Sequence, residues 1–485
     1  PFQTALARVN WTKWEEPPMP RTPSTADDDI FDLRLNRSAP DLWPMLDALY
    51  GQRDDYDAFK AALLKSLRKA WKDRAPDLKR LDLIRDLEPD WFQRADMAGY
   101  VFYIDRFAGN LKGVLDRLDY LDELGISYVH FMPCLKPRPG DSDGGYSVMD
   151  YRAINPAYGK MADFEAVTAE LRQRGISVCI DLVLNHTAKE HVWAKKAAKG
   201  DATYQDFYLM FDDATLPKRY EETLVEVFPD NAPGNFTHYP DFGKWVWTTF
   251  NEHQWDLNWA NPAVFLDITD IMLFLANQGV DVLRLDAVAF MWKRMGTRCQ
   301  SEPEVHMLLQ ALRACSRIAA PAVIHLEEAI VSPQEMLPYL GRGKHDGREG
   351  NLAYHNSLMV HFWGALATRD TRLMSHVLAT HFPDRLRARG QALFAVLGYG
   401  LSGVVGGLLL PRVDHRLVRL AEEREAVPLD AFDQVDLPQG VAPIERAAHD
   451  SRDEIIELAQ RARRRQGGSA HMERDVEALV VHPDR

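Results

Sequence analysis

The sequence GVDVLRLDAV, at residues 279–288, has the pattern of a buried parallel strand. Apolar residues bounded by a glycine alternate with polar ones, and Arg284 and Asp286 stand at the far end. A carboxylate that emerges from the end of a strand in a barrel enzyme is placed to do chemistry. This stretch therefore predicts a barrel strand with a functional carboxylate.

Two other stretches repeat this pattern. The sequence AVIHLEEA, at 322–329, is an apolar strand that ends in Glu328, and ISVCIDLVLNHT, at 176–187, ends in the polar pair Asn185 and His186. Helix-sized segments that stop at a glycine, at 111–124 and 162–174, separate earlier strands, and a helix at 263–278 leads into the strand at 280–285. Repeated strand–helix units predict an α/β fold, a (β/α)8 TIM-type barrel that is incomplete in this chain.

The chain divides into three parts. Residues 1–90 are interpreted as an irregular arm followed by a helical domain, because apolar residues recur there at three- and four-residue steps. Residues 91–384 carry the catalytic barrel. An insertion at 187–262, after the third strand, holds five tryptophans and no clean period. We expect it to be irregular and to shape a binding site.

The composition changes abruptly near Asp384. All 12 tryptophans lie at or before Trp363, and arginine dominates over lysine further on. Residues 385–485 are therefore interpreted as an atypical tail, frame-shifted or foreign to the barrel. A divergent but genuine C-terminal domain is the alternative.

The bulk properties exclude some classes of partner. The net charge of −13 argues against nucleic acid, since phosphate backbones require basic clusters. No run approaches the ~20 apolar residues of a membrane span, which argues against a membrane protein. The four cysteines lack CxxC spacing and are expected to be buried, reduced thiols. A cytoplasmic location is expected; since the chain begins with Pro1 rather than Met, a lost leader and secretion remain open. The oligomeric state is not indicated.

The strand-end carboxylates suit the cleavage of an acetal. Retaining cleavage uses two carboxyl groups about 5–5.5 Å apart, one as nucleophile and one as acid and then base. Asp286 is the candidate nucleophile, because Arg284 faces the same side of the strand and is expected to keep it ionised. Glu328 is the candidate acid, because apolar Ala329 and Ile330 follow it. Its neighbour Glu327 faces the other way and is interpreted as structural.

Other candidate site residues carry weaker signals. Asp143-Gly-Gly-Tyr146 is a loop that can bring a tyrosine ring over a sugar, although a glycine turn with a packed tyrosine is the plainer interpretation. Trp245 and Trp247 fit a core or a sugar platform equally well, whereas Phe250 favours the site. The pair Asn185-His186 is not a metal signature, because no partner ligand stands at a suitable spacing.

The sequence resembles three of the four sequence regions of the α-amylase superfamily, glycoside hydrolase family 13. The resembling stretches are 181–186, 282–286 and 328–330. Longer stretches, at 142–147, 233–236, 245–251, 254–258 and 284–293, are similar to the amylosucrase branch. The fourth region, a His-Asp pair expected shortly after Asp384, is missing. His345-Asp346 comes too early in the chain, and His449-Asp450 opens a predicted helix.

The resemblance implies an activity and a set of roles. The implied reaction is retaining α-glucosyl transfer from sucrose to an α-glucan, with release of fructose, through a covalent ester on the nucleophile and without a metal or organic cofactor. A sucrose hydrolase and a non-catalytic truncated remnant are the alternatives. The resemblance assigns catalysis to Asp286 and Glu328, and substrate binding to Asp143, Tyr146, His186, Phe250, Gln254 and Arg284.

Overall fold

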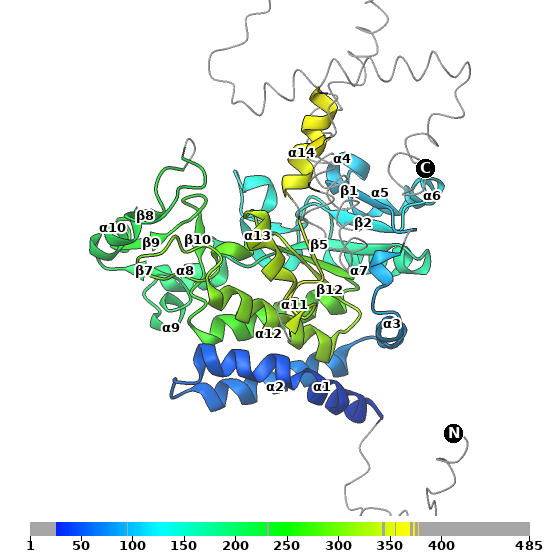
Figure 1. Ribbon diagram of the computed structural model, residues 1–485, viewed down its shortest axis with the longest axis horizontal. Coiled ribbons are helices and arrows are strands. Elements are labelled where there is room, and N and C mark those ends of the chain that lie inside the picture. Colours follow the sequence, from blue (N-terminus) through cyan, green and yellow to red (C-terminus); the bar gives the residue numbers. More distant parts are fainter. Residues whose placement is uncertain are drawn as a thin grey trace, which may run out of the picture.

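The computed structural model describes residues 26–368, apart from 95, 230, 231, 342–344 and 355, together with 372, 373 and 377. The expected arm at 1–25 and tail at 385–485 lie outside the described residues. Within them, strands and helices alternate around one curled sheet, with a small projecting sheet on one side and a layer of N-terminal helices below (Figure 1).

The central sheet has six strands among the described residues, all paired in parallel. In spatial order they are β1 (Gly99–Phe102), β2 (Tyr128–Phe131), β5 (Ser177–Val183), β11 (Val282–Asp286), β12 (Ile324–Glu327) and β13 (Leu352–Ala353). The spatial order follows the chain order, as in a barrel wall. The expectation of an incomplete (β/α)8 barrel is confirmed.

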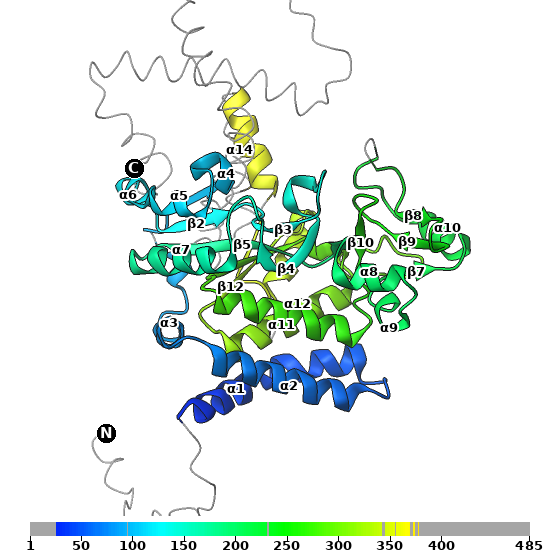
Figure 2. The same cartoon turned by 180° about the vertical axis from the view of Figure 1, so that it is seen from behind.

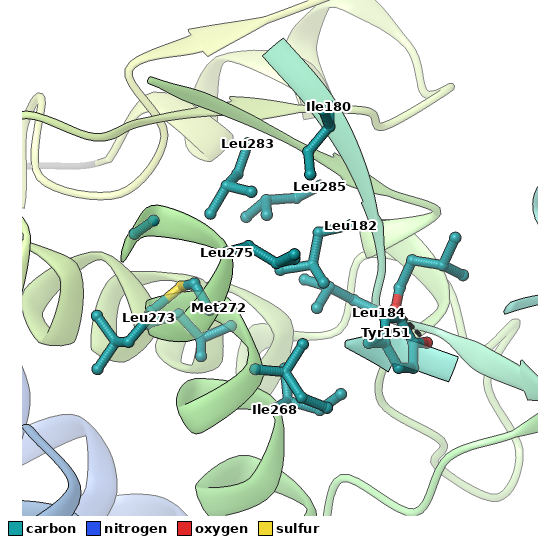
Figure 3. Packing of buried hydrophobic residues seen from close by; sticks show 14 of the residues in the cluster. Tyr151, Ile180, Leu182, Leu184, Ile268, Met272, Leu273, Leu275, Leu283 and Leu285 are labelled. Atoms are coloured by element: carbon teal, nitrogen blue, oxygen red, sulfur yellow. Dashed lines mark hydrogen bonds between the residues drawn. The ribbon is translucent and has the colours of Figure 1, made fainter. Parts of the chain in front are cut away.

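The two faces of the sheet bury different residues. Leu283 and Leu285 of β11 lie beside Ile180 and Leu182 of β5 and pack against α11 (Pro262–Asn277) (Figure 3). The intervening residues face the concave side, where Val282 joins a separate apolar cluster. Because side chains alternate along a strand, the same register places Arg284 and Asp286 on the concave side.

Two of the predicted helices between strands form as expected, and a third is divided. Met161–Gln173 (α7) and α11 match the predicted helices to within one residue at each end. The predicted helix at 111–124 is instead two short helices, Leu111–Leu115 (α5) and Leu118–Glu123 (α6). Both bury their apolar positions, so the helical period is preserved while the backbone turns at 116–117. Further helices are α4 (Ile104–Ala108), α12 (Pro303–Ala319), α13 (Pro333–Met336) and α14 (Asn356–Thr368).

The predicted N-terminal helices pack directly on the barrel helices. They are α1 (Ala26–Tyr50), α2 (Tyr56–Asp73) and α3 (Pro76–Leu87), and α1 and α2 lie along α12 and α11 in both views (Figures 1 and 2). The Tyr50 hydroxyl donates to the Trp259 carbonyl at 2.8 Å, and the Ser66 hydroxyl donates to Asp270 at 2.9 Å. The helices therefore share one hydrophobic core with the sheet.

The described part of the insertion at 187–262 contains regular strands and helices, which corrects the expectation of an irregular segment. It holds the antiparallel sheet β7 (Met210–Phe211), β9 (Lys244–Trp247) and β8 (Phe236–Tyr239), with helices α8 (Val192–Ala198), α9 (Ala202–Gln205) and α10 (Thr215–Glu221). Aromatic packing holds this sheet together: the ring of Trp247 lies 4.6 Å from Phe236 and 4.7 Å from Tyr220, centroid to centroid. Strands of two to four residues are too short to show a period in the sequence.

Shorter elements connect the insertion and the loops to the sheet. Strand β10 (Gln254–Asp256) pairs with β6 (His186–Ala188), and β3 (Leu135–Pro137) pairs with β4 (Val148–Ile154). All four cysteines are buried and free, as expected. Among the described residues, no helix has the length and apolar character needed to cross a membrane.

Candidate active site

One guanidinium joins the two predicted carboxylates at the carboxyl end of the sheet. Arg284 Nη1 lies 2.5 Å from Asp286 Oδ1, and Nη2 lies 3.5 Å from Glu328 Oε1. All three side chains are largely buried, with 11 to 18% of each exposed. The alternation of side chains along β11 therefore brings together the residues that the sequence analysis paired.

A third carboxylate faces the same guanidinium from the neighbouring strand. Asp181 lies opposite Arg284 in the β5–β11 register, and its Oδ1 is 2.5 Å from Arg284 Nη1. Its other oxygen lies 3.2 Å from His130 Nε2 on β2. Burial favours the neutral acid, but Arg284 and His130 together outweigh it and lower the pKa of Asp181. The sequence analysis did not single out Asp181 or His130, although both occupy concave-face positions.

The charge state of Asp286 differs from the expectation. Burial raises the pKa of this carboxyl, Arg284 opposes the rise, and Glu328 and Asp181 add to it, giving a pKa of about 7. The expectation that the guanidinium keeps Asp286 ionised therefore does not hold at neutral pH, because burial, together with Glu328 and Asp181, outweighs the effect of Arg284.

A strained backbone turn holds Glu328. Its Oε2 accepts a hydrogen bond of 2.9 Å from the backbone N–H of Ala287. Ala287 has φ of 58°, a left-handed conformation that a residue with a Cβ seldom adopts. The apolar surroundings expected for Glu328 are present on one side only, because Ala329 is buried whereas 68% of Ile330 is exposed.

Two tyrosine rings flank the guanidinium. Arg284 Cζ lies 5.4 Å from the ring centroid of Tyr146 and 5.7 Å from that of Tyr354. The Tyr146 hydroxyl also accepts a hydrogen bond of 3.4 Å from Arg284 Nη1. Tyr354 was missed by the sequence analysis. Its position two residues after buried Leu352, at the end of a strand, was the available signal.

The loop that carries Asp143 is anchored to the insertion. Its Oδ2 accepts hydrogen bonds from Gln254 Nε2 at 3.2 Å and from Asn251 Nδ2 at 3.4 Å. Gly145 has φ of 102°, and a Cβ there would lie 2.8 Å from the side chain of Pro133. Gly145 thus allows a tight turn against Pro133, and the same turn carries Asp143 and Tyr146.

His186 and Phe250 form a second wall. Their ring centroids are 5.2 Å apart, and Phe250 also packs 5.4 Å from Phe290. Only 2% of His186 is exposed, and within the described residues its Nε2 has no hydrogen-bond partner. Burial lowers the pKa of His186 to about 4, so the ring is neutral near pH 7 and can hydrogen-bond to a ligand hydroxyl.

Trp245 and Trp247 lie apart from this wall. Trp247 is 1% exposed in the core of the small sheet, and half-buried Trp245 packs against His238, 5.1 Å between ring centroids. The structure thus favours the core interpretation for Trp247. Among the described residues, no group of three or more His, Cys, Asp or Glu side chains is arranged to hold a metal ion.

The misplaced His-Asp pair lies at the opposite edge of the sheet. His345 comes before β13, and its Nδ1 is 3.1 Å from Asp41 on α1. It therefore cannot serve as the missing fourth region. His449-Asp450 lies outside the described residues.

A parallel β/α sheet with paired carboxylates at its carboxyl end is the arrangement of barrel enzymes that act on glycosidic bonds. The profile of one such family, described as the catalytic domain of alpha amylase, matches residues 86–363. The chain belongs to this alpha-amylase family.

Relatives of known function cover part of the chain. Trehalose synthase/amylase TreS of Mycobacterium tuberculosis is 33% identical over 303 residues, which are 60% of this chain and 49% of that protein. Glucosylglycerate phosphorylase of Spirochaeta thermophila is 31% identical over 332 residues, 65% of this chain and 50% of that protein. The chain thus spans about half the length of these curated relatives. The crystal structure of Bacillus licheniformis trehalose-6-phosphate hydrolase aligns with a TM-score of 0.49 at 26% identity, over 56% of this chain and 50% of that one.

Proposed function

We propose that Asp286 and Glu328 carry out retaining glucosyl transfer from sucrose to an α-glucan. The observation that carries this proposal is the guanidinium of Arg284, which contacts both carboxylates. The cation between them keeps the nucleophile and the acid close together at the carboxyl end of the sheet. A two-step displacement requires both groups beside the same glycosidic bond.

The proposed first step breaks the glycosidic bond. Ionised Asp286 attacks the anomeric carbon of the glucosyl unit and forms a glucosyl ester, while Glu328 gives its proton to the leaving oxygen of fructose. In the second step Glu328 takes the proton from an acceptor hydroxyl, whose oxygen displaces the carboxylate of Asp286. Ala287 N–H, which donates to Glu328, orients this carboxyl for both proton transfers.

The proposed pocket accepts one terminal glucosyl unit. Tyr146 stacks beside Arg284, and Asp143, held by Gln254 and Asn251, closes the end. His186 Nε2 supplies a buried polar atom for a sugar hydroxyl. Glucosylglycerate phosphorylase is named for a small glucoside, which supports a small donor, whereas TreS is named both for trehalose and as an amylase.

Sucrose turnover and its products test the proposal. The purified chain is incubated with sucrose, with and without an α-glucan, and free fructose and free glucose are measured separately. Fructose in excess over glucose supports transfer, and equal amounts support the hydrolase alternative. A rapid fall in the viscosity of a starch solution would contradict the blind pocket.

A trapping experiment separates an active site from a non-catalytic remnant. Glu328→Gln is mixed with α-glucosyl fluoride, whose leaving group needs no proton, and the digested protein is analysed by mass spectrometry. One added glucosyl unit on the peptide that contains Asp286 is expected. If no ester forms with a folded protein, the proposed nucleophile is wrong and the remnant alternative gains support.

A further inference from the structure

A cavity lies at the amino-terminal edge of the sheet, opposite the carboxylates. It has a volume of about 180 Å³ and is bounded by α1, α3, α12 and the first residue of β12. The residues that matter for its chemistry are Arg37, Arg85, Arg313, Arg317, Asp86 and Trp91. Four guanidinium groups and one carboxylate thus surround one space.

The carboxylates nearby are already shared. Asp86 pairs with both Arg34, at 3.3 Å, and Arg37, at 3.1 Å. Asp41, which pairs with Arg317 at 3.1 Å, also pairs with Arg348 at 3.0 Å. The cavity therefore holds an excess of positive charge, although the whole chain has a net charge of −13.

Arg313 is the unbalanced member of this cluster. Only 8% of it is exposed, and within the described residues no carboxylate forms an ion pair with it. Its Nη1 donates to the Val323 carbonyl at 3.2 Å and to the Ser316 hydroxyl at 3.3 Å, while its Nε has no partner among the described residues. A buried polar group without a partner is costly and calls for a ligand or water.

Electrostatics agrees with this geometry. Burial lowers the pKa of Arg313 to about 9, Arg317 lowers it further, and Glu327 and Asp86 oppose the change. The buried carboxyl of Glu327 does not neutralise Arg313, because burial raises the pKa of Glu327 well above its usual range and favours the uncharged acid. Neither of its oxygens has a hydrogen-bond partner in the described part of the chain. An anion in the cavity would compensate the buried guanidinium.

Arg85 connects the cavity to the sheet. Its guanidinium lies 3.6 Å from the Trp91 ring centroid and 2.5 Å from Asp281 Oδ1, and it donates to Ser177 Oγ at 3.1 Å and to the Ala322 carbonyl at 3.1 Å. These partners stand at or just before the beginnings of β5, β11 and β12. An occupant of the cavity would therefore lie beside the residue that holds three strands together.

We propose that this cavity binds a tetrahedral oxyanion of the phosphate type. Planar guanidinium forks match the oxygens of phosphate, and several of them converge here. The volume of about 180 Å³ exceeds the ~10–15 Å³ that one water needs and falls below the ~300–1,000 Å³ of common organic-ligand sites. The anion binds free or as the phosphate group of a small ester.

The test is thermal unfolding of the purified chain in rising concentrations of sodium phosphate, with sodium chloride at matched ionic strength as reference. A ligand that binds only the folded state raises the unfolding temperature in a saturable manner. We expect such a rise with phosphate and not with chloride, and one bound phosphate per chain by calorimetric titration. The same measurement with glucose 6-phosphate, and with glucose as reference, distinguishes the two forms of the anion. A rise in the unfolding temperature with glucose 6-phosphate and not with glucose means that the cavity accepts a phosphate ester, and a rise with inorganic phosphate alone means that it accepts only the free anion.

Arginine variants locate the effect. Arg313→Gln and Arg37→Gln should each abolish the phosphate response. Arg53→Gln is the matched control, because Arg53, like Arg37, is a partly exposed N-terminal arginine paired with one aspartate, but it lies outside the cavity. If Arg313→Gln fails to fold, Arg37→Gln decides. A response that equals that of chloride, or that survives Arg37→Gln unchanged, overturns the proposal and leaves a water-filled cavity.

Discussion

The two edges of the parallel sheet carry opposite excesses of charge. At the carboxyl edge, Arg284 is shared by Asp181, Asp286 and Glu328. At the amino edge, arginines share too few carboxylates, and Arg313 has none within the described residues. One sheet thus separates an acidic concentration of buried charge from a basic one.

At both edges, burial converts an imbalance of charge into a tendency to bind a group of the opposite charge. Burial disfavours a charged form that its neighbours do not fully compensate, so it raises the pKa of Asp286 to about 7 despite Arg284 and lowers that of Arg313 to about 9. An excess of carboxylate can stabilise a developing cation, and an excess of guanidinium can bind an anion. The predictions that follow test whether the two edges differ in this way.

The largest effect is expected from Asp286→Asn. The amide cannot form the glucosyl ester, so sucrose turnover should fall by about 10⁴-fold or more. Fructose release measures the loss. Asp119→Asn, an exposed carboxylate in a surface ion pair with Arg174, serves as control and should retain activity. Near-normal turnover by Asp286→Asn would show that the carboxyl edge does not supply the nucleophile.

Glu328→Gln should lose less, and the loss should depend on the leaving group. Removal of a general acid typically lowers the rate by ~10²–10⁴-fold when the leaving group needs a proton. We therefore expect this loss with sucrose and a much smaller loss of the first step with α-glucosyl fluoride. Equal losses with both donors would assign Glu328 a role other than proton transfer.

At the amino edge, Arg85→Gln should destabilise the fold. Asp281 is buried beside Arg85, so removal of the guanidinium leaves an uncompensated charge and should lower the free energy of unfolding by about 3–5 kcal/mol. Arg94→Gln breaks an exposed pair with Asp96 and should change it by about 0–1 kcal/mol. Urea titrations compare the two; similar losses would mean that Arg85 does not hold the strands together.

The smallest effect is the pH dependence set by Asp286. Only the ionised carboxylate attacks, so kcat/KM for sucrose should fall about tenfold for each pH unit below a pKa of about 7. The raised pKa also means that the folded protein binds this proton more tightly than the unfolded chain does. The resulting stabilisation is complete below the ordinary pKa and is lost as the pH rises through about 7.

Unfolding measurements check the sign of that linkage. The stability of Asp286→Asn relative to the parent should increase between pH 4 and pH 8, because only the parent loses the protonated carboxyl. A difference that is constant with pH would show that Asp286 ionises with its ordinary pKa in the folded protein.

Local patterns predicted much of this fold. The strands at β5, β11 and β12 were recognisable because buried parallel strands have uniform apolar character, and α7 and α11 because their period and glycine stops are local. The small sheet of the insertion was not recognisable, since it depends on the packing of Trp247 among rings distant in the sequence.

The strand pattern in the sequence was enough to show which side chains share a face. Two-residue alternation set Arg284 and Asp286 on one side, and the strand end placed Glu328 near them. Their charge state emerged only from the folded arrangement, because it depends first on burial and then on the carboxylates that surround Arg284. The basic cavity at the other edge also depends on the fold. Arg313 and Arg37 are distant in the sequence and line one cavity only because α1 packs on α12.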